Sequence, residues 1–168
     1  MPYWKEVATT LAVKYHRTER ETAHLLALIN MVAFDGLVAS HEAKFFYWLL
    51  RPTMADPGIT LAIPLNFPSY PSNHAVLSSG IARILGASFP AERDRLDALA
   101  QEAAICQIYG GIHYRFDADA GLVLGRRVSA WALRARRQRS RAVRVAVMLD
   151  AGGTHVVESH TLQQVRFN

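Results

Sequence analysis

Residues 67–75 read FPSYPSNHA, and this stretch decides how the chain is organised. Two prolines stiffen the backbone before the apolar run AVLSSGIARILGA (75–87), and Ser72 or Asn73 is a good N-cap for a helix over that run. A helix N-terminus presents unpaired backbone N–H groups and the positive end of the helix dipole. The polar entry to this helix therefore predicts one wall of an anion-binding pocket.

Helical spacing of apolar residues continues on both sides of this stretch. Thr18 and Glu21 form a predicted capping box, and Pro52 and Pro90 are expected to end one helix and begin another. Further helices are expected from Thr18 onward, over about 40–50, from Pro90 to the Gly110–Gly111 pair, and over about 117–139.

The C-terminal sequence differs in its pattern. AVRVAVMLD and THVVESHTLQQVRF alternate apolar and polar residues around Ala151–Gly153, which is typical of a β-hairpin. We therefore predict an all-α helical domain over residues 1–140 and a small β-hairpin extension over residues 141–168.

The composition is that of a globular protein with one core. The chain has 168 residues, of which 51% are hydrophobic and 20% charged. Its apolar runs are shorter than the roughly 20 residues of a membrane helix, so no membrane span is expected. The N-terminus lacks the pattern of a secretory signal, which predicts a cytoplasmic location. The single Cys106 excludes an internal disulfide.

The net charge of +5 is concentrated in one segment, residues 125–144. Such a segment suits either a solvated helix face or an anionic partner, such as nucleic acid or an acidic membrane. Aromatic residues do not alternate with these arginines as base stacking requires, so nucleic acid is the less favoured partner.

Polar residues with the chemistry of oxyanion binding recur at set intervals. Lys44 and Arg51 are seven residues apart, about two helical turns, and could converge on one anion. Ser72 and the backbone N–H groups that follow it offer neutral donors. His113 precedes Asp117 by four residues, so the carboxylate could hold the imidazole in one tautomer.

These blocks resemble a known family. The pattern K-x6-RP, PSGH and SR-x5-H-x3-D is the signature of the type-2 phosphatidic acid phosphatase and vanadium-dependent haloperoxidase superfamily. Here it reads KFFYWLLRP (44–52), PSNH (71–74) and CQIYGGIHYRFD (106–117). The three blocks occur in order, and the chain looks most like the bacterial haloperoxidase-type branch. The resemblance implies a helical bundle of the haloperoxidase and acid phosphatase type.

The resemblance also implies a role for each matching residue. His113 would attack phosphorus or coordinate vanadium, Asp117 would orient it, and His74 would be the general acid. The oxyanion would be bound by the remaining motif positions: Lys44, Arg51, Ser72, Asn73 and Gln107.

Two positions depart from the family pattern. Asn73 replaces a glycine, and Gln107 replaces an arginine that would make a charged, bidentate contact with the anion. Because a charge-assisted hydrogen bond is about twice as strong as a neutral one, Gln107 is expected to slow catalysis and weaken the binding of vanadate.

Three functions of the oxyanion site stay open at this point, and nucleic-acid binding by the segment of residues 126–144 is a fourth, less favoured hypothesis. The first is hydrolysis of phosphate monoesters through a phosphohistidine, and the second is halide oxidation by peroxide with vanadate as the prosthetic group. The third is a degenerate, non-catalytic member that binds an anion or a protein partner. The expected substrate is a phosphate-containing or other small anion, no cluster demands a metal cation, and the short chain is expected to complete its core as a homodimer.

Overall fold

The computed structural model describes residues 2–60 and 65–151, and all regular structure in those residues is helical. The elements are α1 (Pro2–Lys14), α2 (Glu19–Tyr47), α3 (Pro52–Ala55), α4 (Asn73–Ser88), the short 3-10 helix η1 (Pro90–Glu92), α5 (Arg93–Tyr109) and α6 (Arg115–Ala151). The all-α prediction is confirmed. The chain forms two compact units, residues 1–133 and 134–168. The predicted boundary between residues 140 and 141 stays a prediction.

Helix α2 begins as the sequence predicts but ends differently. The Thr18 hydroxyl accepts the Glu21 N–H, and the Glu21 carboxylate accepts the Thr18 N–H. The separate helix expected over 40–50 is instead the last part of this one 29-residue helix. The helix runs without a break through Gly36, which is buried against Val76 on α4. The helix ends where Trp48 takes a left-handed conformation, with φ of 47°.

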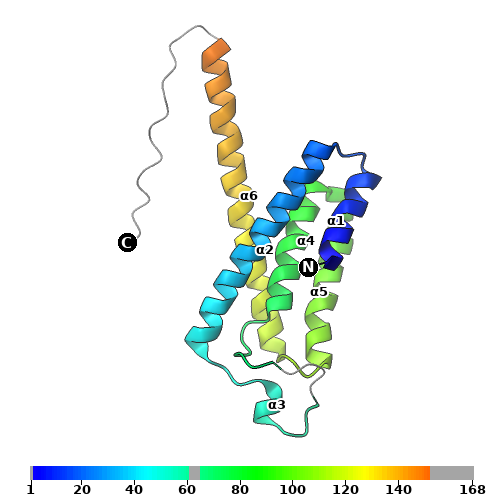
Figure 1. The fold of residues 1–168 in the computed structure, drawn as a ribbon, viewed down its shortest axis with the longest axis vertical. Helices are drawn as coiled ribbons and strands as arrows, with labels where there is room; N and C mark the ends of the chain where they lie inside the picture. Colours follow the sequence, from blue (N-terminus) through cyan, green and yellow to red (C-terminus); the bar gives the residue numbers. More distant parts are fainter. Residues whose placement is uncertain (1, 61–64, 152–168) are drawn as a thin grey trace. The chain divides into compact units, whose positions relative to one another are not determined.

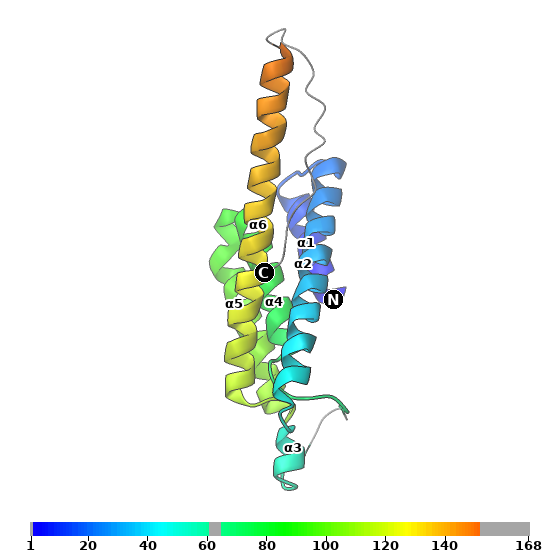
Figure 2. The same cartoon turned by 90° about the vertical axis from the view of Figure 1, so that its left-hand side faces the viewer.

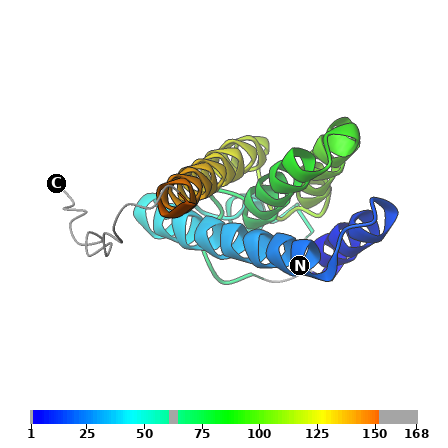
Figure 3. The same cartoon turned by 90° about the horizontal axis from the view of Figure 1, so that it is seen from above.

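Helix α4 is the central element of the first unit. It packs against both α2 and α5, and α1 contacts α2 and α4 (Figures 1 and 3). The main apolar core lies between these helices and comprises Trp4, Ala8, Leu11, Leu25, Leu28, Ile29, Val32, Ala33, Ile81, Ala82, Ile84, Leu85, Phe89, Leu96 and Ala100. Full burial of each large aliphatic side chain stabilises the fold by roughly 1.5–3 kcal/mol, so this core supplies much of the stability of the bundle.

The first part of α6 lies directly against α4 (Figure 2). A Cβ atom at Gly125 would stand 2.1 Å from the Val76 carbonyl oxygen and 2.2 Å from the Ser79 hydroxyl. Glycine is therefore required for the two backbones to approach this closely. The contact fixes the start of α6, which carries Asp117, relative to the start of α4.

The C-terminal prediction needs a correction. Residues 142–150, expected as the first strand of the hairpin, belong to α6, which continues to Ala151. Extending an existing helix adds a hydrogen bond for each residue fixed, whereas a hairpin needs a new nucleus, so continuation overrides the local alternation. The rest of the predicted hairpin, residues 152–168, lies outside the described residues.

Candidate functional site

The predicted site residues gather at one end of the bundle. The end of α2, the start of α4, the end of α5 and the start of α6 all meet there, beside α3 (Figure 1). Segments that are far apart in sequence, residues 44–51, 69–74 and 107–117, are thereby brought together. The three motif blocks, which are separate in the sequence, thus lie together in one part of the fold.

His113 is positioned by the turn that follows α5. The backbone N–H groups of Ile112 and His113 both donate to the Gln107 carbonyl oxygen, at 3.0 and 3.2 Å. Gly111 has a φ of +67°, and a Cβ atom there would stand 2.6 Å from the Thr60 carbonyl oxygen. The Gly-Gly pair therefore makes the tight turn that places the imidazole next to the start of α6.

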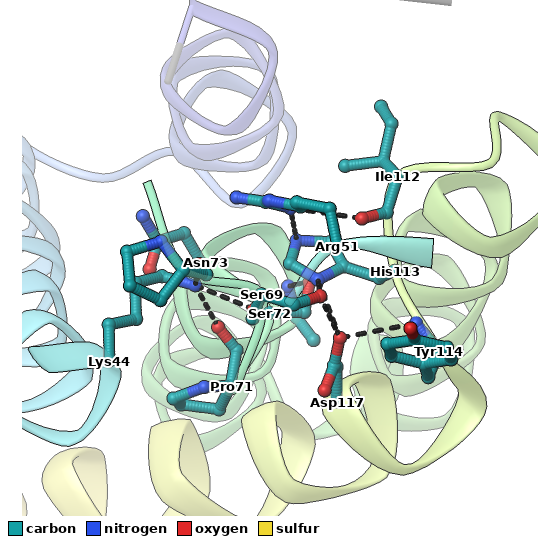
Figure 4. Close-up of polar contacts among 12 residues, drawn as sticks. Lys44, Arg51, Ser69, Pro71, Ser72, Asn73, Ile112, His113, Tyr114 and Asp117 are labelled. Carbon is teal, nitrogen blue, oxygen red and sulfur yellow. Dashed lines mark hydrogen bonds and ion pairs between the residues drawn. The ribbon is translucent and has the colours of Figure 1, made fainter. Parts of the chain in front are cut away.

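Asp117 receives several donors on one oxygen and none on the other. Its Oδ2 accepts from His113 Nδ1 at 3.0 Å, from the Ser69 hydroxyl at 2.5 Å and from the Tyr114 N–H at 3.1 Å (Figure 4). Its Oδ1 is buried and has no hydrogen-bond partner. The carboxylate is fully buried, so these contacts fix its orientation toward the imidazole.

Arg51 lies on the other side of the His113 ring (Figure 4). Its Nη1 donates to the Ile112 carbonyl oxygen at 3.0 Å and stands 3.2 Å from His113 Nε2, while its Nε donates to the Phe67 carbonyl oxygen. Its Nη2 is buried without a partner, although the residue is only 2% exposed. A buried guanidinium N–H that lacks a partner is costly, and it is the donor that a bound oxyanion would use.

These contacts determine the protonation state of His113. A guanidinium can only donate, so His113 Nε2 must be the acceptor from Arg51, and the ring proton resides on Nδ1 and is donated to Asp117. Burial lowers the pKa of His113, and this effect exceeds the opposing one of the hydrogen bond to Asp117. The neutral ring therefore keeps a lone pair on Nε2, which is the form that a nucleophile needs.

Lys44 makes a different set of contacts from those expected. Its Nζ donates to the backbone carbonyl oxygens of Pro68, Ser69 and Pro71, at 3.1, 2.8 and 2.5 Å. Burial lowers its pKa to about 7. All three ammonium protons are directed at the loop before α4, so an oxyanion would have to compete with these carbonyl groups. Binding of an oxyanion by Lys44 stays a prediction.

The start of α4 forms as the sequence predicts. Ser72 is the N-cap and its hydroxyl accepts the Ala75 N–H at 3.4 Å. The side chain of Asn73 does not point freely into the site, because its Oδ1 accepts from the buried Ser40 hydroxyl on α2. His74 is exposed on the first turn, and desolvation lowers the pKa of its ring.

Gln107 occupies the last turn of α5, beside the segment that carries His113. Its side-chain Oε1 is buried and has no hydrogen-bond partner. A carboxamide at this position offers a dipole and both donors and an acceptor, but no charge. Together with Arg51 Nη2 and Asp117 Oδ1, it is one of three buried polar side-chain atoms without a partner among the side chains that the structure describes, those of residues 2–60 and 65–138.

The structure thus joins some of the predicted residues directly and leaves others apart. Arg51, His113 and Asp117 form one hydrogen-bonded row, whereas no hydrogen bond joins His74 to that row within the described chain. Sequence reasoning missed Ser69, which is fully buried and bonded to Asp117. The signal was present, because FPSYPSNHA contains two Pro-Ser pairs and only the second was assigned a role.

Comparison with known proteins shows the family of this chain. A model of the PAP2 superfamily matches residues 24–141, which include every predicted site residue. The chain belongs to the PAP2 superfamily. No curated protein matches the chain by sequence.

Two solved structures share the fold. One is a bacterial vanadium-dependent iodoperoxidase, with a TM-score of 0.70 and 23% identity over 78% of this chain and 37% of that one. The other is a transmembrane PAP2-type phosphatidylglycerolphosphate phosphatase from Bacillus subtilis, with a TM-score of 0.54 and 16% identity over 82% of this chain and 79% of that one. This chain therefore spans little more than a third of the length of the iodoperoxidase.

The partner prediction that excluded a membrane span is wrong. A transmembrane phosphatase has the same fold along most of both chains, and the segment Glu19–Ala55 is long and apolar enough to cross a membrane. A membrane helix does not require an uninterrupted apolar run, because a mean hydropathy of 1.6 over 18 residues tolerates the isolated polar residues of α2. Since one relative is a transmembrane protein and the other an iodoperoxidase, the fold by itself assigns no cellular location.

Proposed function

We propose that this protein is a phosphatase that transfers a phosphoryl group to His113 and then to water. The observation that carries the proposal is the row Arg51–His113–Asp117, in which a neutral imidazole presents the lone pair of Nε2 while Nδ1–H is held by a buried carboxylate. This is the arrangement of an activated nucleophile with an orienting group and an adjacent positive charge.

In the proposed reaction the Arg51 Nη1–H turns from Nε2 of His113 to a phosphoryl oxygen, which frees the Nε2 lone pair. Nε2 then forms a bond to phosphorus, and the bond from phosphorus to the ester oxygen breaks. The leaving oxygen takes a proton from His74, which the exposed first turn of α4 makes accessible to the substrate. Water then attacks the phosphohistidine, and His74 accepts the water proton. Arg51 Nη2, which has no protein partner, would bind a phosphoryl oxygen together with the N–H groups at the start of α4.

The proposal is tested with 4-nitrophenyl phosphate and a pair of histidine variants. His113→Ala is expected to lower kcat by at least about 10³-fold, because the nucleophile is lost. His24→Ala, which changes an exposed histidine on α2, is the matched control and should retain full activity. Mass spectrometry after an alkaline quench should detect a phosphorylated His113 peptide in the wild type. Equal turnover by wild type and His113→Ala would exclude this mechanism.

The second candidate, halide oxidation with vanadate, draws on the iodoperoxidase relative and on the lone pair of His113 Nε2. Vanadate would supply activation of peroxide, and His113 and Arg51 are suited to hold it. The rest of the donor set does not fit a multiply charged group, since Lys44 is committed to three carbonyl oxygens and Gln107 is neutral. The donor set therefore favours the phosphatase over the haloperoxidase.

A further inference from the structure

The site contains few positive charges for an oxyanion pocket. Among the described residues that hydrogen-bond to His113 or Asp117, Arg51 is the one arginine, and the buried carboxylate of Asp117 offsets its charge. The geometry of the Arg51 contact makes His113 neutral, as argued above. His74 is exposed on the first turn of α4, so solvent screens the charge that its ring carries when it is protonated.

Lys44 adds at most one further charge. Its Nζ already has three carbonyl acceptors, and with a pKa of about 7 it is only partly protonated at neutral pH. Summed over Lys44, Arg51 and Asp117, the site carries a net charge of +1 when Lys44 is protonated and zero when it is not. The net charge of these three groups therefore does not exceed +1, whether or not Lys44 is protonated.

The neutral side chain of Gln107 keeps the net charge of the site low. An arginine at this position would raise the limit by one charge, whereas the carboxamide adds none. The carboxamide does add an acceptor, because its Oε1 is buried without a partner, on a residue whose backbone carbonyl accepts the His113 N–H. An unpaired buried acceptor is satisfied by a ligand that still carries a proton, such as a P–OH group.

We propose that this site selects singly charged tetrahedral oxyanions, and that for a phosphate monoester it takes the monoprotonated form rather than the dianion. The inference rests on the proposed function and specifies the substrate of the same site. A second negative charge on the ligand would have no counter-charge in a buried site, where an unpaired charge is costly. A singly charged ligand balances the site and can donate its proton to Gln107.

The test compares inorganic phosphate with sulfate, which has the same shape, by isothermal titration calorimetry on the full chain. At about pH 6 phosphate carries mainly one charge and sulfate two, whereas at about pH 8 both carry mainly two. Phosphate is expected to bind at least about tenfold more tightly than sulfate at the lower pH, and the ratio should approach one at the higher pH. Comparing the two ions at each pH cancels any change in the protein's own charge.

Two variants at position 107 sharpen the result. Gln107→Arg should remove the preference by strengthening the binding of sulfate about tenfold or more. Gln107→Glu has nearly the shape of the wild type and should weaken sulfate more than phosphate, which keeps the test valid if the arginine variant does not fold. Sulfate binding as tight as phosphate in the wild type at about pH 6 would overturn the inference, as would an unchanged ratio in Gln107→Glu, or no binding of either ion at millimolar concentration.

Failure of the inference is distinguishable from failure of the proposed function. Turnover of 4-nitrophenyl phosphate that depends on His113, combined with equal binding of sulfate and phosphate, would overturn the charge selectivity alone. Selective binding of phosphate without any turnover would support the charge selectivity and overturn the phosphatase.

Discussion

Two buried carboxyl groups at opposite ends of α4 are used in different ways. Glu92, just after α4, accepts Lys14 Nζ and the Tyr15 hydroxyl on Oε1 and Arg95 Nε on Oε2, so both oxygens have partners. Asp117, beside the start of α4, has three donors on Oδ2 and none on Oδ1. The first group is a completed structural network, whereas the second lies next to polar atoms that still lack partners.

The difference indicates where the protein has kept binding capacity. A buried polar network is most stable when each member is satisfied, and orphaned buried atoms cost free energy. The three orphaned side-chain atoms of the described residues belong to Arg51, Gln107 and Asp117, all at the same end of the bundle. The free-energy cost of unsatisfied polar atoms therefore falls at that end. Substitutions there should mainly change activity, whereas substitutions at the Glu92 end should mainly change stability.

The largest effect is expected for Asp117→Asn. An asparagine can present its amide N–H₂ to His113 Nδ1 and so stabilise the wrong tautomer, which should lower kcat by roughly 10³–10⁴-fold. Steady-state kinetics with 4-nitrophenyl phosphate would measure the loss. Asp119→Asn, on the exposed side of α6 two residues later, is the control and should behave as the wild type. Normal kcat in Asp117→Asn would contradict the orienting role of this carboxylate.

A smaller loss is expected for Arg51→Lys. The ammonium keeps the charge but cannot contact the Ile112 carbonyl oxygen, His113 and the anion at once. We expect kcat to fall about 10²-fold, as for the removal of one transition-state donor. The control is Arg126→Lys at an exposed position of α6, which should leave the rate unchanged. A rate within a factor of two of wild type would mean that Arg51 has only a structural role.

Ser69→Ala should produce a loss of about tenfold in kcat, because one hydrogen bond to a charged group is removed. Ser78 provides the matched control, since it is also a buried serine but bonds Trp4 in the core. Ser78→Ala should lower the melting temperature and leave kcat unchanged. If Ser69→Ala also changed only the melting temperature, Ser69 would belong to the fold and not to the site.

The smallest effect on activity is expected at the other end, for Glu92→Gln. Its three donors lower the pKa of Glu92 from an ordinary value of 4.5 to about 2, with the Lys14 hydrogen bond as the largest cause. The folded-state pKa is depressed, so the stabilisation is fully present above about pH 4.5 and is lost as the pH falls toward 2. The melting temperatures of the wild type and of Glu92→Gln should differ by a few degrees at neutral pH. The two values should converge as the pH falls toward about 2. A constant difference at every pH would show that packing, not charge, is responsible.

Much of the site could be predicted from sequence because its residues occur in short blocks with fixed spacing. The i, i+4 relation of His113 and Asp117 brings the two side chains within hydrogen-bond distance on one turn, and the N-cap at Ser72 follows from local chemistry. The capping box at Thr18 is equally local. Each of these features depends on a few neighbouring residues and needs no knowledge of the fold.

Only the tertiary structure determined which hydrogen bonds the three motif blocks make with one another. The three carbonyl oxygens that hold Lys44 lie 24 to 27 residues away, and the Ser69 contact to Asp117 spans 48 residues. No local pattern states which donors a buried lysine will find, because that depends on which backbone groups the packed helices leave unpaired. The sequence by itself determined the local blocks that carry the predicted site residues. The fold determined that Ser69 joins them, and it determined which of their hydrogen-bonding groups have no protein partner.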